Sequence, residues 1–299
     1  MSVLKGLSAF TVTPTDDAGR VDTDHLAQFV ARLRRPGISS IGVLGSTGGY
    51  MYLDARERKR AIETAVEAAG DTPVLAGVGA LTTREVLAHI RDAQDAGATA
   101  VLVAPVSYLP LVDADVTALF RDVRSATTLP VCFYNNPGTT GFTPSEELIR
   151  SLAANGTIDA VKMPPAPNGD FASQITRLRD ETPDDFIIGY SGDSAIAGAL
   201  RDGADAWYSV LAGTLPEIAI ALWNARRNDA ERDRLTALLR LLFNTFDRHG
   251  SIRIIHEVVD LIGLGTVALP CPLLPLDSEV RESIAHALDL LPEVRDKAA

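Results

Sequence analysis

The residue with the clearest capacity for chemistry in this 299-residue chain is Lys162. It ends the mainly apolar segment 157–161, in which an ammonium group would be removed from water. Removal from water favours the neutral amine, and a neutral amine can attack a ketone to form a Schiff base. A lysine at the end of a strand can also extend its charge into solvent. The sequence leaves both interpretations open.

A second candidate is Tyr134, which lies in the segment 132–138 with the sequence CFYNNPG. A phenol beside an amine can move the protons that the formation and collapse of a carbinolamine require. A tyrosine at the end of a strand can equally be a packing residue. Cys132, two residues earlier, is more typical of a small buried apolar residue than of a nucleophile.

The segment 45–49 has the sequence GSTGG and could hold an anion. Closely spaced glycines let backbone N–H groups approach a negative group, and the hydroxyls of Ser46 and Thr47 add two donors. A carboxylate is the natural ligand for such a loop. The segment is not a phosphate-binding P-loop, because the required Lys-Ser/Thr pair is missing. A simple glycine-rich turn between a strand and a helix is the alternative.

Each of these candidates lies at the end of a short apolar segment, and such segments recur along the chain. We predict eight strands, at 7–13, 38–45, 73–78, 100–104, 129–134, 158–162, 186–190 and 206–210. They are apolar almost throughout and are separated by amphipathic stretches, which is typical of a parallel sheet covered on both faces. Eight such units favour an α/β fold, the (β/α)8 TIM barrel, whose site lies at the carboxyl ends of the strands.

After residue 210 the predicted strands end. We predict helices at 215–226, 229–246, 252–262 and 278–291, of which the first completes the eighth unit. The chain therefore divides into a catalytic barrel at 1–226 and a three-helix C-terminal extension at 227–299 that packs on the barrel. The apolar segment 269–276 contains three prolines, so we expect it to be extended and not helical.

Composition restricts the class of partner. Asp and Glu outnumber Lys and Arg by 39 to 28, and the formal charge of −11 would repel nucleic acids and anionic membranes. Two cysteines give no disulfide framework, and neither a signal-peptide pattern nor a membrane-length apolar segment occurs, so we expect a cytoplasmic protein.

His256 and Glu257 begin like a zinc motif, but Asp260 stands where the second histidine is required. We expect neither a metal nor an organic cofactor.

Together, GSTGG at 45–49, YNNPGTTG at 134–141 and VKM at 161–163 resemble the dihydrodipicolinate synthase and N-acetylneuraminate lyase family of class I aldolases. The resemblance covers nearly the whole chain, including the sequence SGD at 191–193. It implies a TIM barrel, a Schiff-base mechanism and assembly as a homotetramer.

The resemblance also implies a role for each matching position. Lys162 corresponds to the Schiff-base lysine, and Tyr134 to the tyrosine that donates and accepts protons, with Thr47 as its expected relay partner. Ser46 and Thr47 correspond to the pair that holds the carboxylate of pyruvate or another 2-oxo acid. Tyr208 corresponds to the residue whose backbone carbonyl touches the keto acid. The other expected substrate-binding positions are Gly192 and Thr139.

Three departures from the family pattern affect the expected substrate. Gly49 replaces an acid, and Ser107 stands where dihydrodipicolinate synthases lend a tyrosine to the adjoining subunit. Thr139 replaces the arginine that holds the carboxylate of aspartate semialdehyde. Without that arginine, a dianionic second substrate would lack a charge-assisted contact, which typically contributes ~1.5–3 kcal/mol.

The leading prediction is therefore a Schiff-base-forming aldolase, lyase or dehydratase. Its substrate would be pyruvate or a related 2-oxo acid, such as a 2-keto-3-deoxy sugar acid or a 4-hydroxy-2-oxo acid, together with an aldehyde. One alternative is a true 4-hydroxy-tetrahydrodipicolinate synthase. A non-catalytic barrel that binds keto acids is the other.

Overall fold

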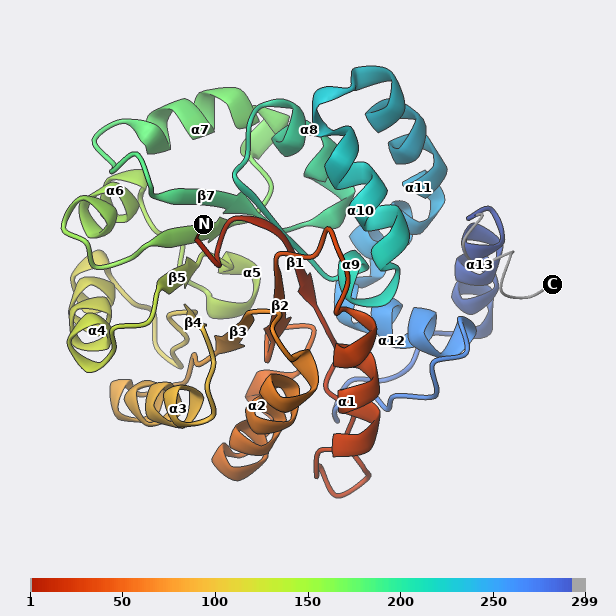
Figure 1. Ribbon diagram of the computed structural model, residues 1–299, viewed down its shortest axis with the longest axis horizontal. Helices are drawn as coiled ribbons and strands as arrows, with labels where there is room; N and C mark the ends of the chain where they lie inside the picture. Colours follow the sequence, from red (N-terminus) through yellow and green to blue (C-terminus); the bar gives the residue numbers. More distant parts are fainter. Residues whose placement is uncertain (1, 292–299) are drawn as a thin grey trace.

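The computed structural model describes residues 2–291 and forms a closed barrel of parallel strands (Figure 1). The eight strands follow chain order around the barrel, and β1 pairs with β8 to close it. Their bounds are β1 Gly6–Phe10, β2 Ser40–Val43, β3 Val74–Gly77, β4 Ala100–Val103, β5 Val131–Tyr134, β6 Ala160–Met163, β7 Ile187–Tyr190 and β8 Ala206–Ser209. The predicted TIM barrel is confirmed.

Helices surround the barrel and cover the outer face of its strands (Figure 1). The helices between strands are α1 Thr23–Arg32, α2 Ala55–Ala69, α3 Thr83–Asp95, α4 Asp113–Ala126, α5 Pro137–Thr140, α6 Glu146–Ala154, α7 Phe171–Arg179 and α8 Ile196–Arg201. After β8 come α9 Leu211–Thr214 and α10 Pro216–Asn224. Within residues 2–291, no helix combines the length and the apolar character needed to cross a membrane.

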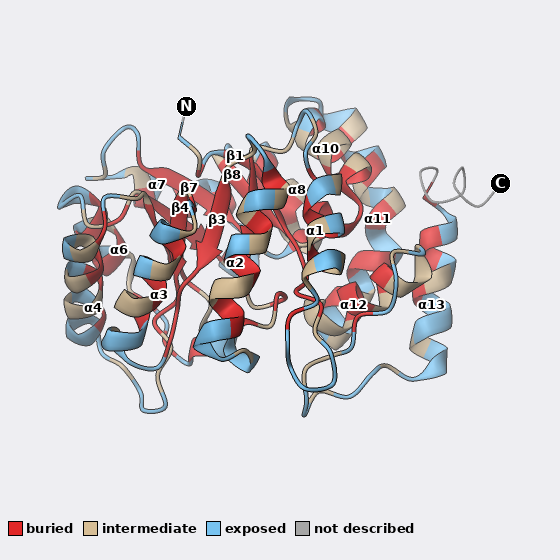
Figure 2. Cartoon of the chain, turned by 60° about the horizontal axis from the view of Figure 1, so that its bottom comes forward, coloured by how far each residue is buried: buried red, intermediate tan, exposed pale blue. Residues whose placement is uncertain are grey.

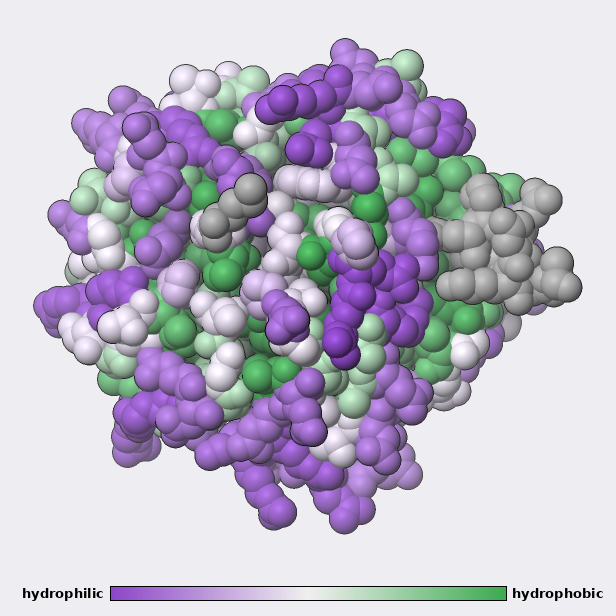
Figure 3. Space-filling view, viewed as in Figure 1, coloured by the Kyte–Doolittle hydropathy of each residue, from purple (hydrophilic) through white to green (hydrophobic). Residues whose placement is uncertain are grey.

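The outer helices begin where side chains satisfy free backbone N–H groups. Asp22 accepts a hydrogen bond from the backbone of His25 at the start of α1, and Asp54 accepts one from Glu57 at the start of α2. Hydrophilic residues dominate the outer edge of the molecule over α1, α2 and α7 (Figure 3). These helices therefore place polar faces toward solvent and apolar faces toward the strands.

The strands are buried on both faces, which explains why their sequences are apolar almost throughout (Figure 2). One apolar cluster fills the space between the barrel and its helices. A second, smaller cluster fills the barrel interior and includes Phe10, Leu75, Leu102, Cys132, Tyr134, Ile187 and Tyr208. The barrel is thus packed with side chains below the site, and this packing fixes the strand ends that carry the candidate residues.

Gly77 at the end of β3 allows the chain after β2 to turn toward the barrel mouth. Leu44 has the unusual φ of 56° for a residue with a side chain, and a Cβ built on Gly77 would lie 1.8 Å from its carbonyl oxygen. We expect Gly77→Ala to lower the free energy of unfolding by at least about 3 kcal/mol, because rigid backbone blocks the new methyl group.

Urea unfolding followed by circular dichroism measures this change. Gly138→Ala is the matched control, because the nearest atom to its Cβ, Asn136 Oδ1, lies at 4.0 Å. It should change the free energy of unfolding by less than about 1 kcal/mol. Equal stability of the two variants would contradict the proposed contact between Gly77 and Leu44.

The C-terminal extension contains α11 Asp229–His249, α12 Ser251–Leu261 and α13 Ser278–Asp289 within the described residues. Helix α11 packs against α8 and α10, and α12 packs against α9, so the extension lies beside the last barrel units (Figure 1). The proline-containing segment 269–276 has no helix, as predicted. The division of the chain at 226/227 stays a prediction, and residues 292–299 of the predicted extension lie outside the described residues.

Candidate functional site

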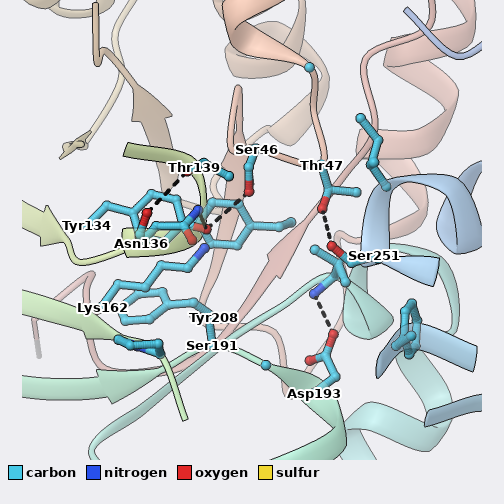
Figure 4. A pocket seen from close by; sticks show the side chains of 18 of the residues that line it. Ser46, Thr47, Tyr134, Asn136, Thr139, Lys162, Ser191, Asp193, Tyr208 and Ser251 are labelled. Atoms are coloured by element: carbon cyan, nitrogen blue, oxygen red, sulfur yellow. Dashed lines mark hydrogen bonds between the residues drawn. The ribbon is translucent and has the colours of Figure 1, made fainter. Parts of the chain in front are cut away.

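A cavity of about 600 Å³ opens at the carboxyl ends of the strands and collects most of the candidate residues (Figure 4). Its lining comes from the strand ends, the loops that follow them and the C-terminal extension. The predicted site residues that line it are Ser46, Thr47, Tyr134, Thr139, Lys162, Gly192 and Tyr208. The barrel therefore brings together positions that are far apart in the sequence.

Lys162 lies on β6 inside the barrel mouth, and only 3% of the residue is exposed. Its Nζ lies 4.0 Å from the ring centroid of Phe10 and 4.1 Å from that of Tyr134. Within residues 2–291 no carboxylate lies within 4.0 Å of this nitrogen. The interpretation in which the side chain extends into solvent is wrong, since aromatic faces surround its end.

Tyr134 lies on β5 directly opposite Lys162 in the strand register and is 6% exposed. Its hydroxyl lies 3.1 Å from Ser46 Oγ and accepts a hydrogen bond of 3.0 Å from Asn136 Nδ2. Phenol and amine thus share one side of the cavity (Figure 4). Sequence reasoning missed Asn136, although the YNNPG segment places it two residues after Tyr134.

Thr47, the expected relay partner of Tyr134, makes a different contact. Its Oγ1 lies 3.2 Å from the hydroxyl of Ser251 on α12, whereas Ser46 contacts the phenol. The two neighbouring hydroxyls point to opposite sides of the cavity because the 45–49 loop turns between them (Figure 4). The structure therefore corrects the expected pairing from Thr47 to Ser46.

The 45–49 loop lies close against β1. A Cβ built on Gly48 would lie 3.2 Å from both the backbone nitrogen of Leu44 and the carbonyl oxygen of Thr11, so glycine permits the tight turn. Gly49 follows with a φ of 64°. This backbone holds Ser46 and Thr47 at the rim, where both line the cavity.

Asp193 organises the side of the cavity formed by β7 and β8. Its buried carboxylate accepts a 2.7 Å hydrogen bond from Trp207 Nε1 and bonds from the backbone N–H groups of Val210 and Leu211. Burial raises the pKa of the Asp193 carboxyl, while these hydrogen bonds act in the opposite direction. The residue follows Gly192 and ties the end of β7 to the start of α9.

Two further residues of the barrel interior have side chains directed away from the reacting end. The Tyr208 hydroxyl donates to the carbonyl of Leu4 at 3.0 Å, deep in the barrel. Cys132 is fully buried, and burial raises the pKa of its thiol to about 12. The interpretation of Cys132 as a core residue therefore agrees with its surroundings.

The C-terminal extension supplies one wall of the cavity, which sequence reasoning missed. Besides Ser251, this wall contains Asp247, whose carboxylate accepts a 2.7 Å hydrogen bond from Ser194 Oγ. The other lining residues from the extension are Phe246, Gly250, Ile252 and Leu273. A pattern read strand by strand carries no signal for this contact, because Thr47 and Ser251 are 204 residues apart.

Acidic side chains outnumber basic ones among the described residues that line the cavity. Lys162 is the single cationic side chain among the described lining residues, which also include Asp193 and Asp247. Thr139 is exposed at the rim on α5. In the described part of the chain, no group of three or more His, Cys, Asp or Glu side chains has a metal-binding arrangement.

Comparison with known proteins decides the family. The model of the dihydrodipicolinate synthetase family matches residues 3–291. The chain belongs to this family. The match agrees with the resemblance drawn from the motifs around Ser46, Tyr134 and Lys162, and it confirms the prediction of a lyase of the dihydrodipicolinate synthase family.

Relatives of the family cover almost the full chain. A 4-hydroxy-tetrahydrodipicolinate synthase of Natronomonas pharaonis is 32% identical over 95% of this chain and 96% of its own length. A crystal structure of dihydrodipicolinate synthase from Agrobacterium tumefaciens is 46% identical, with a TM-score of 0.94 and coverage of 97% and 98%. The prophage protein YagE of E. coli K12, in complex with pyruvate, is 24% identical, with a TM-score of 0.89 and coverage of 98% and 99%.

Proposed function

We propose that this lyase of the dihydrodipicolinate synthase family forms a Schiff base between Lys162 and pyruvate or a related 2-oxo acid. The arrangement that carries the proposal is the buried Nζ of Lys162, 4.1 Å from the ring of Tyr134, whose hydroxyl contacts Ser46 and Asn136. A nucleophilic amine beside a phenol that exchanges protons is what imine chemistry requires.

In the proposed cleavage of a 4-hydroxy-2-oxo acid, the Lys162 amine attacks the ketone carbon C2, and one amine proton moves to the ketone oxygen to give a carbinolamine. Tyr134 donates its proton to the leaving hydroxyl, water departs and an iminium forms. The phenolate then accepts the proton of a hydroxyl at C4, the C3–C4 bond breaks, and its electrons form an enamine while an aldehyde leaves. Tyr134 then gives this proton to C3, water adds to the resulting iminium and returns a proton to the phenolate, and collapse of the carbinolamine releases the 2-oxo acid and restores the amine. The same steps in reverse join the two parts.

Two parts of the cavity would hold the substrate. We propose that the 45–49 loop binds the carboxylate, with Ser46 and Thr47 at the rim, which fixes the distance between the ketone and Lys162. Gly192, Thr139 and the backbone carbonyl of Tyr208 are the remaining proposed binding positions. Ser46 takes the proton-relay role that sequence reasoning gave to Thr47.

The charge of the lining favours an aldehyde part without a second carboxylate. Since Lys162 is consumed in the imine, no other cationic side chain among the described lining residues could pair with a distal carboxylate. Asp247 and Ser194 offer hydrogen-bonding groups instead. We therefore propose a substrate of the 2-keto-3-deoxy sugar acid or 4-hydroxy-2-oxo acid type, cleaved to an aldehyde or dehydrated.

Borohydride reduction with pyruvate tests the Schiff base. Pyruvate is the first probe because the YagE neighbour is in complex with it. Intact mass and peptide mapping should place the reduced adduct on Lys162. The kcat/KM values of neutral hydroxyaldehydes and of aspartate semialdehyde are then compared, with pyruvate as the second substrate in each assay. Absence of an adduct with pyruvate and with sugar-acid substrates would remove the proposal.

True 4-hydroxy-tetrahydrodipicolinate synthesis is the second candidate, favoured by the name of the relative that is 32% identical. Efficient turnover of aspartate semialdehyde would support it against the neutral aldehyde. Thr139→Arg provides a direct comparison, because it adds a cation at the rim position that the resemblance assigns to the carboxylate of that substrate. If the neutral aldehyde is the substrate, Thr139→Arg should raise the relative kcat/KM for aspartate semialdehyde.

We also propose a homotetramer located in the cytoplasm. The loop after β4 exposes Tyr108 by 92% and Leu109 by 69%, and the neighbouring loops after β2 and β3 expose Met51, Tyr52 and Leu81. Apolar side chains exposed in this way are typical of contacts between copies. Analytical ultracentrifugation that finds only monomers at micromolar concentration would contradict the proposed tetramer.

The proposed location in the cytoplasm is supported by the cysteines. Both are free thiols, which fits a reducing compartment.

A further inference from the structure

We propose that Asn136 is a positioning residue that sets the direction of proton transfer by Tyr134. The inference rests on the proposed Schiff-base function and adds a residue to it. Asn136 Nδ2 lies 3.0 Å from the Tyr134 hydroxyl, and Ser46 Oγ lies 3.1 Å from the same hydroxyl. The phenolic oxygen therefore lies between an amide on one side and a hydroxyl on the other (Figure 4).

The chemistry of the amide fixes the role of each partner. A side-chain NH2 group donates hydrogen bonds and does not accept them, so the phenolic oxygen must accept from Asn136. The single phenol hydrogen is then free to point to Ser46 or into the cavity. A serine hydroxyl both donates and accepts. Ser46 can thus accept from the phenol and, after the proton has left, donate to the phenolate.

The same hydrogen bond stabilises the charged form of Tyr134. When Tyr134 has given its proton to the leaving hydroxyl of the carbinolamine, the phenolate keeps its bond from Asn136. A hydrogen bond to a charged acceptor is roughly twice as strong as one to a neutral acceptor. Asn136 therefore favours the phenolate over the phenol at the step in which Tyr134 has given up its proton.

The backbone holds Asn136 in place for this contact. Its carbonyl oxygen accepts 3.0 Å hydrogen bonds from the backbone N–H groups of Thr139 and Thr140 in α5. Pro137 begins that helix, so the turn that carries Asn136 is rigid. The neighbouring Asn135 is buried and faces Met163 instead, with its amide 3.5 Å from the sulfur. Of these adjacent amides, Asn136 is the one that contacts the phenol.

Two substitutions of similar shape separate donation from packing. Asn136→Leu removes the hydrogen bond, and Asn136→Asp replaces the donor by a carboxylate that only accepts and repels the phenolate. We expect kcat to fall about 10- to 100-fold for Asn136→Leu and further for Asn136→Asp, with KM for the 2-oxo acid within about threefold of wild type. In Asn136→Leu the limb of the pH–kcat profile that reports the phenolate should move to higher pH.

Controls distinguish this inference from a folding defect and from failure of the proposed function. Asn244→Asp makes the same substitution at an exposed position of α11 outside the main cavity and should keep wild-type kinetics. Thermal unfolding should show that both Asn136 variants are folded, and borohydride trapping after long incubation should still label Lys162. A missing adduct in wild type would defeat the proposed function itself.

Two outcomes would overturn the role of Asn136 while leaving the Schiff base intact. If Asn136→Asp keeps more than half of the wild-type kcat, the phenol donates to this side chain and the assigned direction is wrong. If Asn136→Leu loses activity with an unchanged pH profile, the amide has only a packing role. A shifted profile together with a trapped adduct supports the proposal.

Discussion

Lys162→Met is expected to lower kcat/KM by at least about ten-thousandfold, a loss on the scale seen when a covalent nucleophile is removed. Methionine has a similar length and no charge, so it fits between the rings of Phe10 and Tyr134 that surround the amine. Stability should therefore change little, and the reduced adduct with pyruvate should disappear. Steady-state kinetics, thermal unfolding and mass spectrometry together measure the effect.

Lys162→Arg is the companion variant, because it keeps a cation but cannot form an imine under the same conditions. Loss of turnover in both variants, with the fold intact, would assign the loss to covalent chemistry. The alternative of a non-catalytic barrel predicts a different result. If wild type binds keto acids without turnover and Lys162→Ala leaves that binding intact, the barrel binds its ligand without catalysis.

Tyr134→Phe is expected to lower kcat by about 100- to 1,000-fold, in the range that a general acid–base group contributes. The substitution removes one oxygen and keeps the ring that faces Lys162 at 4.1 Å. Schiff-base trapping should become slow but reach the same final extent, because the amine remains. The initial rate of adduct formation, compared with its end point, separates proton transfer from binding.

Tyr190→Phe is the matched control for Tyr134→Phe. The Tyr190 hydroxyl donates to Gln174 at 2.8 Å outside the barrel interior and takes no part in the proposed reaction. We expect this control to lose about 1 kcal/mol of stability and to keep kcat. Equal kinetic losses in the two variants would argue against an acid–base role for Tyr134.

The sequence predicts the barrel and the pair of reactive side chains for a simple physical reason. Strands apolar on both faces indicate a covered parallel sheet, and in an eight-unit barrel consecutive strands are neighbours. Tyr134 and Lys162 end consecutive strands, so their side chains were expected to meet, and the register places them directly opposite each other. The burial of the Lys162 amine by Phe10 could not be predicted from the sequence, because it depends on how the side chains of the barrel interior pack.

The directions of side chains in loops could not be predicted in the same way. Ser46 and Thr47 are adjacent and chemically alike, and only the backbone after Leu44, with its φ of 56°, decides which hydroxyl faces Tyr134. The same holds for Asn135 and Asn136, because the sequence does not indicate which of these neighbouring asparagines contacts the Tyr134 hydroxyl. Contacts such as that of Thr47 with Ser251 depend on packing between distant segments.

The hydrogen bond between Thr47 and Ser251 joins the proposed carboxylate loop to a helix outside the eightfold repeat. The wall that carries Ser251 and Asp247 lies outside the strands that hold the amine and the phenol, but Ser251 is linked through Thr47 to the loop whose Ser46 contacts the phenol. Substitutions within residues 246–252 that spare Ser251 are therefore expected to alter which aldehyde is accepted, whereas substitution of Ser251 itself should also disturb the loop that holds the carboxylate.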